Sequence, residues 1–329
     1  FAAGRFPAAA LRIALWLALL AWKIPAWRAR LDVAWSKGWI LPLLLGALLL
    51  GCTLSIRQVG AFAGGLVALY WLTRVRRQAL IPLAGYFILA GLTMYVTWPY
   101  LWRDPWGGLL ASFRLAGDFP SHKVLFDGQV ISSRTLPWEY FPVLAGLQLT
   151  VPAGLLFLAG AALAARRAIT TRALRADVTI VGLWILVPLL NLIFLGMSAY
   201  GTIRHLLFVV PPMFLLAALA VEELLKRLQR PALKALVVCA LLLPGLAGIV
   251  RLHPYEYIYY NELIGGVDGA FGRFELDRWC TSYRQAAEAL NEVAPPDASV
   301  LVYWPVQTAT PYLRPDLQIL TTTSLTQRA

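Results

Sequence analysis

The sequence predicts an all-α polytopic membrane protein with about eight transmembrane helices, followed by a small truncated α/β domain outside the membrane. Of the 329 residues, 59% are hydrophobic and 14% are charged, whereas a soluble domain is only about 45–50% apolar. The apolar residues come in blocks long enough for a helix to cross about 30 Å of hydrocarbon, where helices satisfy every backbone polar group. The expected spans are 7–22, 39–54, 58–72, 79–101, 140–165, 178–197, 205–225 and 233–250.

Basic residues collect in four short connections between these spans, namely 23–38, 73–78, 166–177 and 226–234. If the spans alternate in direction, all four connections face the same side of the membrane. With Glu222 and Glu223 at a helix end, that side carries 15 basic and 4 acidic residues, against 14 and 13 on the other side. Cytoplasmic connections are enriched in Lys and Arg, so the basic side is predicted to be cytoplasmic. The net charge of +12 is therefore assigned to membrane topology and not to nucleic-acid binding.

This orientation divides the chain into two parts. Residues 1–250 are the transmembrane helical domain, with an outer loop at 102–139, and residues 251–329 are a tail on the extracytoplasmic side. The predicted location is a multi-pass cell (inner) membrane. The chain begins at Phe1 without a signal sequence, and we expect it to be part of a longer protein.

The tail has the pattern of a small, incomplete α/β domain. Ser282 to Val293 alternates apolar and polar residues with the period of an amphipathic helix, which the Pro295-Pro296 pair ends. Two further runs, 298–304 and 317–322, are β-branched or alternating and predict strands.

The outer loop and the residues beside it hold most of the candidate substrate-binding side chains. Within WPYLWRDPW, Arg103 and Asp104 stand together at the lipid boundary, as a local salt bridge or as ligands for a phosphate or an acceptor hydroxyl. His122 adds a titratable imidazole, although a single histidine is more often an ordinary surface residue. Aromatic residues at this depth are typical of an interfacial belt. We expect four of them to line the same substrate cavity: Trp98, Trp102, Trp138 and Tyr140.

Two arginines stand at the outer ends of spans, where the topology disfavours a basic residue. Arg57 lies in a tight turn between two spans, and Arg204, followed by His205, lies where another span begins. Each arginine either extends its side chain to the interface or binds an anionic lipid headgroup at the outer leaflet. A guanidinium–phosphate contact is worth about 1.5–3 kcal/mol.

Five strings in order carry a family resemblance: WPYLWRDP, LFDG, LPWEYFP, IRHLLFVVPP and HPYEYIYYNELIGG. They resemble the membrane glycosyltransferases related to protein O-mannosyltransferases and the bacterial aminoarabinose transferase, a glycosyltransferase family 39-like group. The resemblance implies the third, multi-helix fold class of these enzymes. It also implies transfer of a sugar, with inversion, from a polyprenyl-phosphate donor to a protein, lipid or glycan acceptor on the outer face of the membrane.

In that chemistry the lipid phosphate is the leaving group, so cations beside it stabilise the developing charge. We expect Arg57, Arg204 and His205 to bind the donor phosphate. The resemblance also implies an acidic general base in the first outer loop. We expect that base upstream of Phe1, and no catalytic residue is assigned within the chain.

The predicted function is therefore a hexosyl- or pentosyl-transferase that uses a lipid-phosphate sugar donor. Two alternatives remain, namely a transporter or flippase of lipid-linked sugars, and a non-catalytic membrane assembly subunit. The spans lack ionisable residues near mid-bilayer, which disfavours an ion-coupled transporter. No metal site or cofactor is predicted, since the lipid-linked sugar is a substrate. The expected partners are the donor, the bilayer and a protein, lipid or glycan acceptor, with no nucleic acid.

Overall fold

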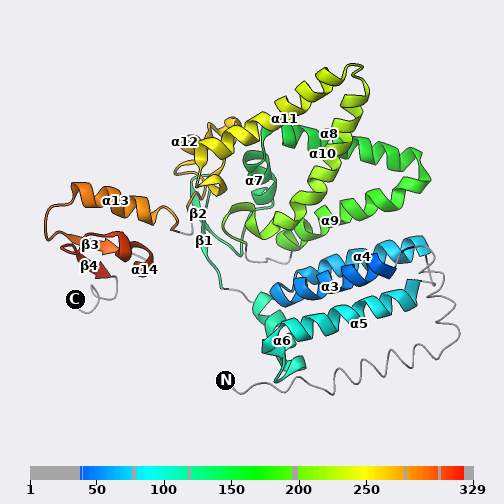
Figure 1. Ribbon diagram of the computed structural model, residues 1–329, viewed down its shortest axis with the longest axis horizontal. Helices are drawn as coiled ribbons and strands as arrows, with labels where there is room; N and C mark the ends of the chain where they lie inside the picture. Colours follow the sequence, from blue (N-terminus) through cyan, green and yellow to red (C-terminus); the bar gives the residue numbers. More distant parts are fainter. Residues whose placement is uncertain are drawn as a thin grey trace. The chain divides into compact units, whose positions relative to one another are not determined.

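The computed structural model describes residues 38, 40–75, 79–117, 120–194, 199–277, 280–302 and 305–321. The chain is mostly helical with small sheets, and it divides into two units, Phe1–Phe119 and Pro120–Ala329. Figure 1 shows the elements of both units in chain order.

The first unit consists of helices. Its elements are α3 (Ile40–Ile56), α4 (Gly60–Val75), α5 (Leu80–Thr97), the short 3-10 helix η2 (Pro99–Leu101) and α6 (Pro105–Gly117).

Helices α3 and α5 pack closely and run parallel. A Cβ atom on Gly46 would lie 3.4 Å from the ring of Tyr86, and one on Gly51 would lie 2.5 Å from the carbonyl oxygen of Ala90. The two contacts advance together along both helices, so the C-terminal ends of α3 and α5 lie at the same end of the unit. Small residues at the contact let the backbones approach, as is common between helices in membranes. The buried cluster between the helices comprises Ala47, Leu50, Tyr86 and Ala90.

The second unit begins with a hairpin and continues through a group of apolar helices into the tail. Its elements are β1 (Lys123–Phe126), β2 (Gln129–Ser132), α7 (Tyr140–Gln148), α8 (Val151–Thr170), η3 (Arg172–Leu174), α9 (Arg175–Phe194), η4 (Thr202–Val209), α10 (Val210–Lys226), α11 (Pro231–Leu252), η5 (Glu256–Ile258), η6 (Glu262–Ile264), α12 (Gly266–Ala270), α13 (Tyr283–Val293), β3 (Ser299–Val302), α14 (Val306–Ala309), η7 (Thr310–Tyr312) and β4 (Gln318–Thr321).

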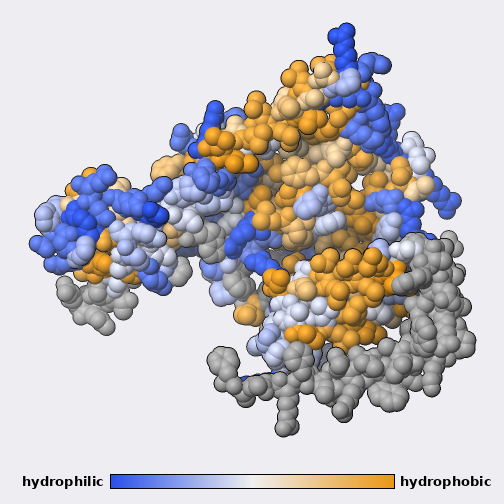
Figure 2. Space-filling view, in the orientation of Figure 1, coloured by the Kyte–Doolittle hydropathy of each residue, from blue (hydrophilic) through white to orange (hydrophobic). Residues whose placement is uncertain are grey.

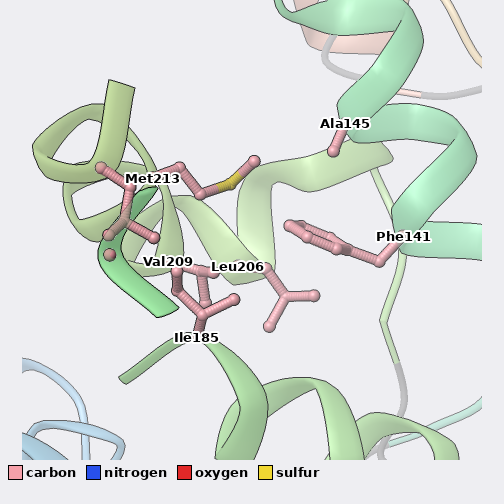
Figure 3. Packing of buried hydrophobic residues seen from close by; sticks show 8 residues of the cluster. Phe141, Ala145, Ile185, Leu206, Val209 and Met213 are labelled. Atoms are coloured by element: carbon pink, nitrogen blue, oxygen red, sulfur yellow. The ribbon is translucent and has the colours of Figure 1, made fainter. Parts of the chain in front are cut away.

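Helices α8 and α10 cross so closely that the residue of α8 at the crossing has no room for a side chain. A Cβ atom on Gly160 would lie 1.7 Å from the carbonyl oxygen of Leu216, so only glycine permits this approach. Around the crossing, α7, α9, η4 and α10 close a hydrophobic core, and Figure 3 shows their side chains pointing toward one another. The core residues are Phe141, Ala145, Ala164, Ile185, Leu206, Val209, Met213 and Leu216.

The two basic connections of this unit lie on the same side of the α8–α10 crossing. Arg167, near the end of α8, forms a 3.2 Å salt bridge with Glu223, near the end of α10. The α8–α9 connection and the α10–α11 connection therefore share one end of the helical group. This arrangement agrees with the predicted clustering of 166–177 and 226–234 on one face.

The opposite end is joined by the buried side chain of Asn261. Its amide nitrogen donates to the carbonyl oxygens of Gly146 at 2.6 Å and Leu149 at 2.8 Å, and its oxygen accepts from the backbone N–H of Leu263 at 3.1 Å. Its own backbone N–H donates to the carbonyl oxygen of Leu147 at 2.8 Å. The end of α7 is thus capped by a residue that follows α11 in the sequence.

Among the described residues, five helical segments are long and apolar enough to cross a membrane: Leu80–Thr97, Val151–Thr170, Arg172–Phe194, Thr202–Lys226 and Pro231–Leu252. The eight predicted spans are not confirmed. Helices α3 and α4, with 17 and 16 residues, measure only about 24–26 Å at 1.5 Å per residue. The predicted span 7–22 lies outside the described residues.

The prediction of one continuous span over 140–165 is wrong. The structure has a separate α7, an extended backbone at Leu149 and Thr150, and then α8 with Pro152 in its first turn. Proline favours the start of a helix because it has no N–H to satisfy there. The carbonyl groups freed by the break are the ones that Asn261 binds.

The secondary structure predicted for the tail is confirmed where it is described, as helix α13 and strands β3 and β4. The two strands pair in parallel, with Leu301 opposite Leu320. On the face drawn in Figure 2, hydrophobic residues cover much of α8–α11, whereas the segment from α13 to β4 is mainly hydrophilic.

Candidate functional site

Three of the predicted site residues meet at the ring of Tyr200. The imidazole of His122 stacks on it with ring centroids 4.2 Å apart and planes at 27°, and the imidazole of His205 lies 4.7 Å away. The guanidinium of Arg204 lies over the same ring at 5.2 Å, a cation–π contact. We call these four residues the Tyr200 cluster. Residues 82 positions apart in the sequence, from 122 to 204, thus form one group.

A buried serine holds the His122 side of the Tyr200 cluster. The backbone N–H of His122 donates to the hydroxyl of Ser133 at 2.8 Å, and the N–H of Ser133 donates to the carbonyl oxygen of His122 at 2.8 Å. The N–H of Ala199 donates to the carbonyl oxygen of Ser133 at 3.2 Å. The hairpin base is therefore bonded to the residue that precedes Tyr200.

On the Arg204 side of the Tyr200 cluster, a turn with a left-handed residue sets the direction of η4. Gly201 has φ of +67°, which glycine adopts without strain, and its N–H donates to the carboxylate of Glu275 at 2.9 Å. The N–H of Ile203 donates to the side-chain oxygen of Gln148 at 3.4 Å. These bonds orient the start of η4, and with it Arg204.

The hydrogen bonds of the two imidazoles identify their protonated nitrogens. Nη2 of Arg204 lies 3.2 Å from Nε2 of His205. A guanidinium only donates, so Nε2 of His205 accepts and its Nδ1 carries the proton in a neutral ring. Nδ1 of His122 lies 3.0 Å from the carbonyl oxygen of Pro120. A carbonyl only accepts, so this nitrogen of His122 carries a proton.

A pocket of about 290 Å³ lies next to the Tyr200 cluster. Arg204 belongs to both, and it is the cation of the pocket wall. Glu275 and Glu256 supply carboxylates, the first bonded to Gly201 and the second 2.7 Å from Nδ1 of His253. The remaining polar side chains of the lining are those of Gln148, Thr202, Tyr257 and Tyr259.

The pKa shifts in the pocket favour a negative Glu256 carboxylate and neutral phenols at neutral pH. A hydrogen bond from its own backbone N–H lowers the pKa of Glu256, and the bond to His253 lowers it further. Burial raises the pKa of Tyr257 and that of Tyr259. Glu256 is therefore an acceptor, whereas both tyrosines keep a proton to donate.

The other predicted residues divide between the two units. In the first unit, Arg57 directly follows α3 and is exposed, and its guanidinium makes no hydrogen bond or ion pair with another described residue. Because α3 and α5 run parallel, Arg57 and Trp98 lie at the same end of the unit. Trp98 stacks on Tyr100 at 5.9 Å, and Nε1 of Trp102 donates to the carbonyl oxygen of Tyr95 at 2.8 Å.

Asp104 has a structural role at the start of α6. Its carboxylate accepts from the N–H of Gly107 at 2.9 Å, which is the hydrogen bond of a helix N-cap. A Cβ atom on Gly107 would lie 2.0 Å from the same carboxylate, so a larger residue there would require the Asp104 carboxylate to move. Arg103 beside it is exposed, and in the described part of the chain it forms no ion pair with Asp104.

Trp138 and Tyr140 occupy different surroundings in the second unit. Trp138 is 68% exposed, whereas Tyr140 is 2% exposed and packs against Phe126 at 5.2 Å. Tyr140 belongs to a core cluster and lines neither the pocket beside the Tyr200 cluster nor a second pocket in the same unit. The second pocket, of about 380 Å³, lies beside the ion pair of Asp127 and Arg273.

The predicted site residues did not include Tyr200, Glu256 or Glu275. A detectable signal existed for the hairpin, since Asp127-Gly128 between alternating apolar residues is a strong two-residue turn pattern. No local pattern relates Glu275 to Gly201. Among the described residues, no group of three or more His, Cys, Asp and Glu side chains is placed to hold a metal ion.

Comparison with known proteins identifies no relative. No protein-family model matches the sequence, and neither a curated protein nor a solved structure matches the chain. Function is therefore inferred from the site and from the membrane-compatible helices around it.

Proposed function

We propose that this chain is part of a membrane glycosyltransferase that takes a sugar from a polyprenyl-phosphate donor and transfers it to a protein, lipid or glycan acceptor. The observation that carries the proposal is the placement of Arg204. Its guanidinium is half-buried at the end of the apolar helices opposite the Arg167–Glu223 salt bridge, and it lines a pocket. A cation at this position fits a phosphate group at the end of a lipid chain.

The topology forms part of this proposal. Eight spans result if 7–22, α3 and α4 are added to the five long segments, with the bilayer thinned around the two shorter helices. The positive-inside rule then places the basic connections in the cytoplasm, and the Tyr200 cluster and residues 251–329 on the extracytoplasmic side. This is the side proposed for transfer.

In the proposed reaction, an acceptor oxygen forms a bond to the anomeric carbon while the bond from that carbon to the phosphate oxygen breaks. The phosphate leaves with the electron pair, and the acceptor proton passes to a base. Arg204 stabilises the charge that develops on the leaving phosphate. His205, neutral while it accepts from Arg204, becomes a second donor to phosphate when it gains a proton. The base is assigned to no described residue.

The test uses the full-length protein and a labelled polyprenyl-phosphate sugar. Arg204→Ala should weaken donor binding by roughly 10- to 150-fold, which corresponds to one charge-assisted contact. Arg57→Ala tests the second predicted cation. Arg166→Ala is the matched control, because Arg166 is an exposed arginine beside the salt-bridged end. Normal donor affinity in both Arg204→Ala and Arg57→Ala would refute the phosphate assignment.

The same preparation separates a transferase from a flippase. In detergent, a transferase forms a glycosylated product because the reaction needs no sealed membrane. A flippase binds the donor in detergent but yields no product, and it moves labelled lipid only in vesicles. A protein that neither binds the donor nor yields product would support the assembly-subunit alternative.

A further inference from the structure

The pocket of about 290 Å³ has two chemically different parts. Arg204 supplies a positive charge on the η4 side, whereas Glu256 and Glu275 supply negative charges from segments after α11. A ligand that suits both parts has an anionic group and several hydrogen-bond donors. The size is at the lower limit for ligand pockets, about 300 Å³, so it fits one small headgroup.

Both carboxylates are held in place before any ligand binds. The N–H of Gly201 fixes one oxygen of Glu275 at 2.9 Å, and the hydroxyl of Tyr260 donates to the Glu275 carbonyl oxygen at 3.0 Å. His253 fixes one oxygen of Glu256 at 2.7 Å. A carboxylate has about four acceptor positions, and a hydrogen bond to one of them orients the whole group. Preorganised acceptors reduce the entropy lost on binding.

Aromatic and amide groups complete the pocket lining. Tyr259 packs against α11 where Gly248 leaves space, since a Cβ atom there would lie 2.9 Å from the ring. The side chain of Tyr257 is held by a hydrogen bond with the hydroxyl of Thr281. Gln148 accepts from Ile203 through its oxygen, which directs its NH₂ donors elsewhere. Rigid phenols beside acceptors and donors suit a ring that carries hydroxyl groups.

We infer that this pocket binds the sugar of a glycosyl phosphate, with the phosphate at Arg204 and the sugar hydroxyl groups donating to Glu256 and Glu275. The inference rests on the proposed function, because it extends the same site from the phosphate to the sugar. It assigns sugar recognition to the segments after α11, separately from the phosphate contact on η4. The glycosyl phosphate can come from a lipid-linked donor or from a soluble sugar phosphate, and both present the same groups to the pocket.

The experiment measures binding to the full-length protein of three probes. They are a farnesyl-phosphate-linked hexose, farnesyl phosphate without sugar, and the corresponding hexose 1-phosphate. Glu256→Gln and Glu275→Gln should each weaken binding of the sugar-linked lipid about tenfold or more, because a charged acceptor for the sugar is lost. Binding of the sugar-free lipid should not change. Glu292→Gln, an exposed glutamate on α13, is the matched control. Binding of hexose 1-phosphate as tight as the lipid-linked sugar would identify the soluble source.

The outcomes separate the two proposals. If both glutamine variants bind all probes as the wild type does, the sugar assignment is wrong, while weakened binding of both farnesyl phosphates by Arg204→Ala would keep the phosphate assignment. If Arg204→Ala changes the binding of neither farnesyl phosphate, the proposed function fails at this site.

If the glutamine variants do not fold, the inference is tested with the wild-type protein and altered ligands. A series of farnesyl-phosphate-linked deoxyhexoses is bound to the wild-type protein, each lacking one hydroxyl group. At least one should bind about tenfold or more weakly, because a site built to bind a hydroxyl rejects an analogue without it. Equal affinity for every deoxy analogue would overturn the inference.

Discussion

The outer ends proposed for the two units differ in the reach of their contacts. In the first unit, Trp102 bonds to Tyr95 and Asp104 to Gly107, seven and three positions apart. In the second unit, Asn261 bonds to Gly146 across 115 positions and Gly201 bonds to Glu275 across 74. Both ends carry arginines and aromatic residues, such as Arg57 and Trp98 in the first unit and Arg204 and Tyr200 in the second. Only long-range contacts bring such residues into a cluster with an adjoining pocket.

The largest expected effect is at Asn261. Asn261→Ala removes three side-chain hydrogen bonds and leaves two carbonyl groups and one N–H unsatisfied, so the free energy of unfolding should fall by about 3 kcal/mol. The measurement is unfolding of the purified protein in mixed micelles. Asn191→Ala is the control, because that amide makes one bond within its own helix, to Val187. Equal losses in the two variants would contradict the importance of long-range contacts.

The next effect is at Ser133, whose hydroxyl accepts from His122. Ser133→Ala should cost about 1–2 kcal/mol, since the N–H of the half-buried His122 loses its acceptor. It should also increase hydrogen exchange at the His122 amide and weaken the stacking on Tyr200. Ser112→Ala in α6, where the hydroxyl bonds to Leu109 three residues earlier, should change stability by less than about 0.5 kcal/mol. An unchanged His122 amide in Ser133→Ala would show that the hairpin holds the cluster without this bond.

A smaller effect is expected at the cap of α6. Asp104→Ala should destabilise the start of this helix by about 1 kcal/mol, whereas Asp104→Asn, which retains an acceptor oxygen, should stay near the wild type. The readout is hydrogen exchange at Gly107 and Gly108. If Asp104→Asn no longer binds the lipid-linked sugar donor while the helix stays intact, the carboxylate has a role in the site beyond capping.

The smallest effect on stability is expected at Arg57. This exposed guanidinium has no pair among the described residues, so Arg57→Ala should change the free energy of unfolding by less than about 0.5 kcal/mol. A large loss of stability would mean that Arg57 makes stabilising long-range contacts, like those that hold the end of the second unit together. The unfolding measurement is the one used for Asn261→Ala.

Local patterns predicted much of the secondary structure. The apolar blocks predicted α5, α8, α9, α10 and α11 because hydrocarbon imposes both length and composition on a helix. The period of the residues from Ser282 predicted α13, and alternation predicted β3 and β4. The break at Leu149 was not predicted, since its carbonyl group is satisfied by a side chain 112 positions away.

The candidate site shows the same contrast between features that local sequence predicts and features that depend on long-range contacts. Arg204 and His205 were recognisable as polar residues at the edge of an apolar block, and His122 as a titratable residue of the outer loop. Nothing in their spacing indicated that they share Tyr200. The sequence by itself determined the membrane-compatible composition, the basic connections and the identity of these side chains, because each depends on neighbours within one helix or turn. The tertiary structure decided which of them meet and what faces the pocket, because those contacts depend on the crossing at Gly160 and on hydrogen bonds between distant segments.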